Sequence, residues 1–286
     1  LHLFQSLCTI TCCYNIEDVY IEKGTKSLGN IGLDTSRKLK NIYYYSSTTL
    51  NNVPERANQI EIDDDGNGGV IIKKADLSSS TTSYDIPSTI NGKKVTAIGD
   101  YAFYENTSLT SVTIPNSVIT IGERAFLNCN SLEAVSIGNK VSKIGVSAFN
   151  SCRVLKAIDI PDSVETIEDN AFRGCSLLET ASIGNNVKSI GNSVFMNCKS
   201  LKSIVIPDSV TNLGSNAFDE CSALKDISIG KGITVLNSSV FLGTGIEEII
   251  IPDNVETISS ATFRECESLK KVTIGNGVTS IGEDAF

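Results

Sequence analysis

The sequence predicts a repeat solenoid of mainly β structure, in which a 23-residue period adds one parallel β-strand per repeat, joined by turns or short helical segments. Phe recurs at residues 103, 126, 149, 172, 195, 218, 241, 263 and 286, so the spacing is 23 residues except for one step of 22. β-Branched residues alternate at one place in every period, and Pro alternates with Gly directly after them. Units of this length cannot bury their apolar faces alone, so they stack.

Each repeat begins with a Phe, and a Leu follows six residues later in most repeats. Because the period brings equivalent side chains into line, we expect the Phe residues to stack in one buried column. Between Phe and Leu stands a Cys, three residues after the Phe. The members of this series are Cys129, Cys152, Cys175, Cys198, Cys221 and Cys266.

The Cys series predicts a ladder of small, buried, reduced thiols. Neighbouring rungs related by translation leave their side chains parallel, whereas a disulfide needs a dihedral angle near 90°. Cys13 matches the series in a weaker N-terminal pattern, whereas Cys8 and Cys12 lie outside it. The redox state of Cys8 and Cys12 stays open, because either thiol could bridge or react.

A strand follows the Leu of each repeat. Pairs such as Ile158 and Ile160 alternate with other residues, which places both β-branched side chains on one face of a pleat. We expect strands at residues 110–114, 134–137 and 157–160 and at the same interval onward, in one parallel sheet with a rise of about 4.8 Å per repeat. The β-branched face is the core face.

The residue after each strand alternates between Pro and Gly. Both end a strand, since Pro lacks a backbone donor and Gly permits a positive φ. The alternation gives a true period of two repeats, which indicates growth by duplication of pairs. A second apolar pair, for example Val141 and Ile144, follows this turn. The alternating residues are Pro115, Gly138, Pro161, Gly184, Pro207, Gly230, Pro252 and Gly275.

One repeat is shortened by a residue at positions 242–246. Thr244 replaces the Cys there, and Ile246 replaces the Leu. We expect a tighter turn in which Gly243 and Gly245 supply unusual backbone angles. The strands on both sides resume in phase, so the sheet should continue across this turn without a gap.

The repeat resembles the BspA-like, or treponemal, class of leucine-rich repeats. The resemblance covers residues 84–286 strongly and 13–45 weakly. It implies a leucine-rich repeat fold in a non-enzymatic cell-surface or secreted protein that mediates adhesion or protein–protein contact, with host matrix proteins or other cells as partners. The motifs that carry it include Ile206-Pro-Asp-Ser-Val210, Asn216-Ala-Phe218 and Cys221-x-x-Leu224.

The chain is expected to divide into three parts. Residues 1–50 are degenerate leucine-rich repeats, either the end of an earlier array or atypical caps, because Val19 and Ile42 keep the 23-residue spacing. Residues 51–83 form a linker and a capping hairpin. Residues 84–286 form the main array, which stops in mid-repeat, so we expect the protein to continue.

The hairpin is predicted from two short strands, at residues 60–62 and 70–72, around a turn rich in Asp and Gly. Asp63, Asp65, Asn67 and Gly68 match the first half of an EF-hand calcium loop, but Lys74 stands where the bidentate Glu is required. We therefore interpret the segment as a solvated turn, without a metal, in a hairpin that covers the open edge of the array.

Composition excludes several functions. The net charge is −9 and no basic stripe is present, so nucleic acid is not an expected partner. There is no apolar run of 18 residues to span a membrane, and the opening residues lack the basic region and cleavage site of a signal peptide. The only His is His2, which excludes Ser-His-Asp and Cys-His catalysis and His-rich zinc sites. We expect neither enzymatic activity nor a cofactor.

The candidate binding face consists of the strand positions between the core-facing residues. These side chains are small and mostly hydroxylic, so they suit an extended protein partner or the mere filling of a tightly stacked sheet. Both interpretations stay open, because the face lacks the Trp, Tyr and Arg typical of binding hot spots. The residues are Ser111, Thr113, Ala134, Ser136, Ala157, Asp159, Thr180, Ser182, Ser203, Val205, Asp226, Ser228, Glu248, Ile250, Lys271 and Thr273.

Three functions are compatible with this pattern. The first is a surface or secreted scaffold for protein interaction and adhesion. The second is a structural spacer that projects another module from the cell surface. The third is an enzyme whose active domain lies outside residues 1–286, which the absence of a catalytic constellation disfavours.

Overall fold

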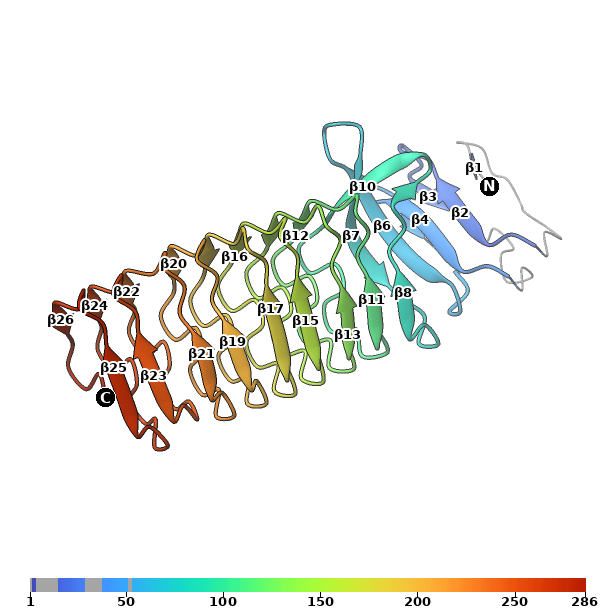
Figure 1. Ribbon diagram of the computed structural model, residues 1–286. Coiled ribbons are helices and arrows are strands. Elements are labelled where there is room, and N and C mark those ends of the chain that lie inside the picture. Colours follow the sequence, from blue (N-terminus) through green and yellow to red (C-terminus); the bar gives the residue numbers. More distant parts are fainter. Residues whose placement is uncertain (1, 4–14, 29–37, 51–52) are drawn as a thin grey trace.

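The computed structural model of the chain describes residues 2–3, 15–28, 38–50 and 53–286. It is an elongated solenoid whose rungs follow one another along one axis (Figure 1). The described residues contain strands and turns but no helix. The predicted β solenoid is therefore confirmed, and its connections are turns.

The predicted strands form a seven-stranded parallel sheet in the order β21-β19-β17-β15-β13-β11-β8. Partners from β11 to β21 lie 23 residues apart, as in Val112 opposite Val135, whereas β8 and β11 pair at a spacing of 28 residues, as in Tyr84 opposite Val112. The predicted strand positions are confirmed, although β11 is shorter by one residue at each end and β13 by one at its end. The bounds are Ser83–Asp85 (β8), Ser111–Thr113 (β11), Ala134–Ser136 (β13), Ala157–Ile160 (β15), Thr180–Ile183 (β17), Ser203–Val205 (β19) and Asp226–Ser228 (β21).

A second sheet runs along the array, so the expectation of a single sheet is wrong. It contains a two-residue strand from each repeat, at the second apolar pair, and two residues are too few to show an alternating pattern. Its order is β1-β2-β4-β6-β7-β10-β12-β14-β16-β18-β20, with β9 attached to β10. The bounds are His2–Leu3 (β1), Asp18–Ile21 (β2), Asn41–Tyr45 (β4), Asn58–Asp64 (β6), Val70–Asp76 (β7), Thr89–Ile90 (β9), Lys93–Ile98 (β10), Thr120–Ile121 (β12), Lys143–Ile144 (β14), Thr166–Ile167 (β16), Ser189–Ile190 (β18) and Asn212–Leu213 (β20).

The third side of each rung is a ladder of turns around the Phe. The residues two before and two after it have positive φ, as in Ser147 (54°) and Ser151 (60°) beside Phe149. Alternate N–H groups donate to the next rung, as from Phe126 to Ala148 O at 2.7 Å, and the others close turns within the rung. This turn ladder satisfies the backbone without helix or strand.

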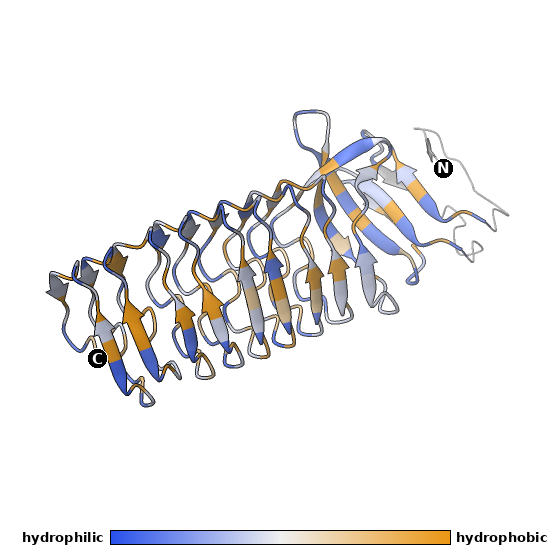
Figure 2. Ribbon diagram, viewed as in Figure 1, coloured by the Kyte–Doolittle hydropathy of each residue, from blue (hydrophilic) through white to orange (hydrophobic). Residues whose placement is uncertain are grey.

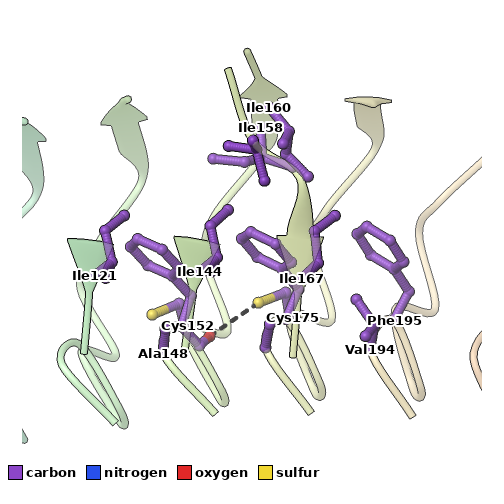
Figure 3. Packing of buried hydrophobic residues seen from close by; sticks show 14 of the residues in the cluster. Ile121, Ile144, Ala148, Cys152, Ile158, Ile160, Ile167, Cys175, Val194 and Phe195 are labelled. Carbon is purple, nitrogen blue, oxygen red and sulfur yellow. Dashed lines mark hydrogen bonds between the residues drawn. The ribbon is translucent and has the colours of Figure 1, made fainter. Parts of the chain in front are cut away.

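The core is built from columns of identical side chains. The rings of Phe103 through Phe263 are at most 1% exposed. Consecutive ring centroids lie 4.8 to 5.7 Å apart, which confirms the predicted Phe column and a rise near the spacing of β-strands. Figure 3 shows the same layering for Ile121, Ile144 and Ile167. In Figure 2 the apolar segments lie in the strands and the hydrophilic ones largely at the rung edges.

The thiols of the Cys ladder are free and buried in the six described repeats that carry them, as predicted. Each Sγ donates to the carbonyl oxygen of the Phe in the preceding rung, as from Cys175 to Phe149 at 3.3 Å (Figure 3). Burial raises the pKa of the Cys175 thiol to about 12, so it stays protonated and can donate. Cys8, Cys12 and Cys13 lie outside the described residues.

The alternation of Pro and Gly has a steric cause. A Cβ on Gly184 would lie 2.5 Å from Pro161 O, so a Gly rung fits closely above a Pro rung. The residue after the Pro completes the contact, because Asp162 Oδ1 accepts the N–H of Asn185 at 2.7 Å. Two successive rungs are therefore one structural unit.

The hairpin of β6 and β7 is confirmed as antiparallel. β7 pairs with β10 and so covers the edge of the main array, as expected. β6 pairs in parallel with β4, and β4 pairs with β2, so the N-terminal segment extends the same sheet. A separate pair of strands, Ser27–Leu28 (β3) and Thr49–Leu50 (β5), lies within that segment.

The sheet of the longer strands does not continue across the short repeat, so that expectation is wrong. The seven-stranded sheet ends at β21, and Glu248–Ile251 (β23) pairs only with Lys271–Ile274 (β25). The other sheet stops at the same level, where Val235–Leu236 (β22), Thr257–Ile258 (β24) and Ser280–Ile281 (β26) form a sheet of their own. We call this interruption between the β20/β21 rung and the β22/β23 rung the joint (Figure 1).

The joint is still spanned by the turn ladder and the Phe column. Phe218 N–H donates to Val240 O at 2.9 Å, and the rings of Phe218 and Phe241 remain stacked at 5.7 Å. Asn237 contributes to the gap, because its side-chain amide donates to Leu213 O at 2.6 Å. In the preceding rung the backbone N–H of Gly214 makes the equivalent bond. An inserted side chain thus replaces a backbone contact.

The two glycines of the short repeat have different roles. The positive φ of Gly243, 63°, is shared by its counterpart Glu220, 59°, so it is not caused by the shortening. Gly245 allows its backbone to pack closely against the preceding rung, because a Cβ there would lie 2.4 Å from Ser222 O. The expectation that both glycines supply unusual backbone angles is therefore wrong, because the φ of Gly243 is common to the repeats and that of Gly245 is not positive.

Candidate binding surface

The outward side of the longer strands presents the candidate face. In β15, Ile158 and Ile160 are buried, whereas Ala157 and Asp159 are exposed. The same alternation places every candidate residue on the outward side, and all are exposed except Ser111, which is half-buried. The structure therefore brings these residues into two parallel rows along the array.

Most of this face is small and polar. Within it, the Ser182 hydroxyl donates to the Asp159 carboxylate of the preceding rung. Lys271 and Glu248 form an ion pair of 3.2 Å. Such short side chains leave the strand surface accessible to an extended partner.

Two apolar side chains interrupt the polar face. Val205 is 64% exposed and Ile250 is 72% exposed, and they occupy the same strand position on either side of exposed Ser228. Isolated exposed apolar residues are common on soluble proteins. These two lie on either side of the joint, Val205 in β19 and Ile250 in β23, and both point outward, so one partner that crosses the joint could bury both.

A row of charges that the sequence analysis missed borders the face. It occupies the position just before each strand, and its signal was the spacing of charged residues at the repeat interval. The ammonium of Lys202, which hydrogen-bonds to Glu179 at 2.5 Å, lowers the pKa of that carboxyl group. These exposed pairs add little stability but place both signs of charge along the row. The row contains Glu133, Lys156, Glu179, Lys202, Lys225, Glu247 and Lys270.

The acidic turn uses its carboxylates for its own structure. Asp65 Oδ1 accepts the N–H groups of Asn67 at 2.7 Å and Gly69 at 2.8 Å, and Oδ2 accepts the Thr96 hydroxyl at 2.7 Å. Hydrogen bonds from Lys23 and Lys93 lower the pKa of Asp64 to about 2. In the part of the chain that the structure describes, no three His, Cys, Asp or Glu side chains gather as metal ligands.

Another feature that the sequence analysis missed is an exposed group of Tyr101, Tyr104 and Arg124 on the turn ladder. Its signal lay in the position two residues before each Phe, which is Ser, Asn, Ala or Asp in the later repeats but Tyr and Arg in the first two.

No helix among the described residues is suited to crossing a membrane.

Comparisons with known proteins identify relatives of this architecture. A family model described as a BspA type leucine rich repeat region matches residues 76–202 and 188–286. A leucine-rich repeat protein from Bacteroides ovatus has a similar structure, with 26% identity over 79% of this chain and 78% of that chain and a TM-score of 0.52. No curated protein matches the chain.

Two further solved structures are similar to the chain. The leucine rich repeat protein of T. pallidum is 24% identical over 81% of this chain and 86% of its own, with a TM-score of 0.48. A leucine rich cell surface protein from Faecalibacterium prausnitzii is 24% identical over 74% of this chain and 92% of its own, with a TM-score of 0.47.

Proposed function

Because this chain belongs to the BspA-type leucine-rich repeat family, we propose that it is a non-enzymatic scaffold, on the cell surface or secreted, that binds a protein partner for adhesion. The observation that carries the proposal is the exposed outward face of the longer strands, which is in register from β11 to β21 and again in β23 and β25 beyond the joint. Solenoids use such extended surfaces for binding. The surface location follows the family resemblance.

The partner is held chiefly at the part of the face that contains Val205 and Ile250. Burying an exposed β-branched side chain contributes about 1.5–3 kcal/mol, more than any of the surrounding hydroxyl groups. The small residues between them let a partner backbone approach the sheet. Host matrix proteins or proteins of other cells are the partner class that the resemblance implies.

A non-catalytic role fits the chemistry of the surface. The matched family model describes a repeat region. The charged residues beside the face are paired across rungs, as Lys156 is with Glu133 at 2.7 Å, and both are well exposed. Carboxylates in that setting lack the desolvation that tunes catalytic acids and bases.

A structural spacer is the alternative function. It is favoured by the self-pairing of the charged row, which leaves fewer groups for recognition. In that case the array holds another module at a distance, and the outward face binds nothing.

Location is tested by labelling intact cells that express the protein with an antibody to the array. We expect labelling without permeabilisation, or recovery of the protein from the medium. Labelling only after permeabilisation contradicts a surface or secreted role.

Binding is tested with purified extracellular-matrix proteins and biolayer interferometry. Val205→Asp and Ile250→Asp should each weaken binding at least tenfold. Val235→Asp is the matched control, because Val235 is 39% exposed on β22, in the other sheet. Equal loss in all three variants contradicts the proposed face, and surface labelling without any binding favours the spacer.

A further inference from the structure

The turn ladder begins with a group of side chains unlike the rest of it. At the position two residues before the Phe, later repeats carry small or amide side chains, whereas the first two carry Tyr101 and Arg124. Both have positive φ, 59° and 54°. This conformation belongs to the position in every later repeat as well, so the bulky side chains, which seldom adopt it, distinguish these two residues.

The three side chains are fixed relative to one another. The Arg124 guanidinium donates to the Tyr101 hydroxyl and lies 5.4 Å from the centre of that ring. Tyr101 and Tyr104 pack edge to face, with centroids 5.8 Å apart. Their exposed fractions are 43% and 42%, so each keeps part of its surface in solvent. Rigid, exposed tyrosines are typical of binding hot spots.

A groove of about 290 Å³ adjoins Tyr104. One wall is Tyr104 to Ser108, and the other is the end of β7 with the residues that follow it, namely Ala75, Asp76, Leu77 and Ser79. This groove, which we call the entry groove, lies where the turn ladder begins, because the end of β7 stands beside the first turn there and its Ala75 N–H donates to Ala102 O at 2.7 Å.

The entry groove is rich in hydrogen-bond acceptors. Among the described residues, no donor reaches the carbonyl oxygen of Tyr104, whereas the equivalent Leu127 O accepts from Glu105 N–H at 2.9 Å. Glu105 and Asp76 also line it, and the Asp76 carboxylate already pairs with Lys74 at 2.7 Å. Glu105 accepts the Tyr104 hydroxyl at 2.7 Å, which leaves further lone pairs available.

An aromatic ring beside carboxylate and carbonyl acceptors suits a cationic donor. A guanidinium offers five N–H groups and stacks on aromatic faces, and the protein already contains this arrangement where Arg124 lies over Tyr101. The net charge of −9 favours the approach of a basic segment. We propose that the entry groove binds an arginine side chain of a basic peptide segment, stacked on Tyr104 and paired with Glu105.

This second site lies on the turn ladder and does not depend on the proposed strand face. The test uses the whole chain, labelled with ¹³C in its Tyr rings, titrated with tri-arginine peptide and, separately, with tri-glutamate and maltose. We expect saturable shifts of the Tyr104 ring signals with tri-arginine only. Equal shifts with maltose would identify a sugar site and overturn the proposal.

Variants separate stacking and pairing from general attraction. Tyr104→Ala and Glu105→Gln should each weaken tri-arginine binding at least fivefold, and Tyr104→Phe should retain it. Glu265→Gln is the matched control, because Glu265 holds the same place in a later repeat, with φ 60°. If it weakens binding as much as Glu105→Gln, the attraction is general and the site is refuted. Ile250→Asp should leave tri-arginine binding intact, which distinguishes this site from the strand face.

Discussion

The Phe column concentrates the stability of each rung in one side chain. Phe172 is fully buried between Phe149 and Phe195, with ring centroids 5.4 and 5.5 Å away. Removing the ring takes contacts from its own rung and from both neighbours. Each Phe therefore stabilises two rung interfaces.

Phe172→Ala should lower the free energy of unfolding by about 3–5 kcal/mol, because the cavity cannot close within a stacked column. Urea denaturation followed by circular dichroism measures the loss. Leu177→Ala, at a 47% exposed position, should change it by less than about 0.5 kcal/mol. A similar loss in both variants would contradict the column's role.

Asp219 is the least well satisfied polar side chain of the turn ladder. It is only 6% exposed, and its Oδ1 has no hydrogen-bond partner, while Oδ2 accepts from Asn216 at 3.1 Å. Burial raises its pKa above the usual value, because the carboxylate loses hydration. The folded state therefore favours the protonated form.

Asp219→Asn should raise the free energy of unfolding at pH 7 by about 1–2 kcal/mol, since it removes a buried charge. With a raised folded pKa, the stability that protonation gives is fully present below the unfolded pKa of about 4 and is lost as the pH rises through the folded pKa. The advantage of the variant should shrink toward pH 3.5, as thermal denaturation across this range would show. Asp226→Asn, on the exposed strand face, serves as control, and a pH-independent gain would refute the explanation.

At the scale of the element, the unit of the array is a pair of rungs. Because Gly184 has no side chain, it leaves space for the carbonyl oxygen of Pro161 in the preceding rung. The carboxylate of Asp162, which follows that Pro, accepts the N–H of Asn185, which follows the Gly. This contact requires a rung with Pro followed by a rung with Gly.

Gly184→Ala should destabilise the protein by about 1–3 kcal/mol, because the new methyl group would lie 2.5 Å from Pro161 O and the rungs would have to separate. Thermal denaturation measures the cost. Pro161→Ala creates no such overlap and should cost less. Equal melting temperatures for the Gly184→Ala variant and the original chain would show that the close approach is not needed.

The sequence predicted the elements whose pattern repeats with an unambiguous period. Strands such as β15, the Phe column and the outward direction of the candidate face all follow from alternation of buried and exposed residues. The two-residue strands could not be predicted because two residues show no alternation. The left-handed residues of the turn ladder could not be predicted because Ser and Glu, which seldom adopt a positive φ, share those positions with Asn, which favours it. The joint was missed because one residue that contributes to it, Asn237, is a single substitution in a turn.

At the scale of the whole molecule, the joint separates two stacks of rungs. It lacks ladder bonds in both sheets and keeps only the turn ladder, the Phe column and a few side-chain contacts, among them the Lys225–Glu247 pair of 3.1 Å. The rung interfaces between β11 and β21 have ladder bonds in both sheets in addition to the turn ladder and the Phe column. The joint is therefore the weakest interface of the array.

Hydrogen exchange should detect this difference at single amides. Asn212 N–H donates to Lys188 O at 3.2 Å and Asp226 N–H to Lys202 O at 3.5 Å, whereas their counterparts Val235 and Glu248 have no such bond across the joint. Val235 and Glu248 should exchange at least tenfold faster than Asn212 and Asp226 in residue-resolved measurements. Uniform protection along the array would contradict the joint.

The joint also sets how the molecule responds to mechanical load. A solenoid pulled at its two ends carries tension through its rung interfaces in series, so the interface with fewest bonds yields first. Peeling one 23-residue rung releases up to about 80 Å of extended chain. The array would then lengthen in discrete steps that start at the joint, and the rungs on either side would keep their surfaces intact while the force is absorbed.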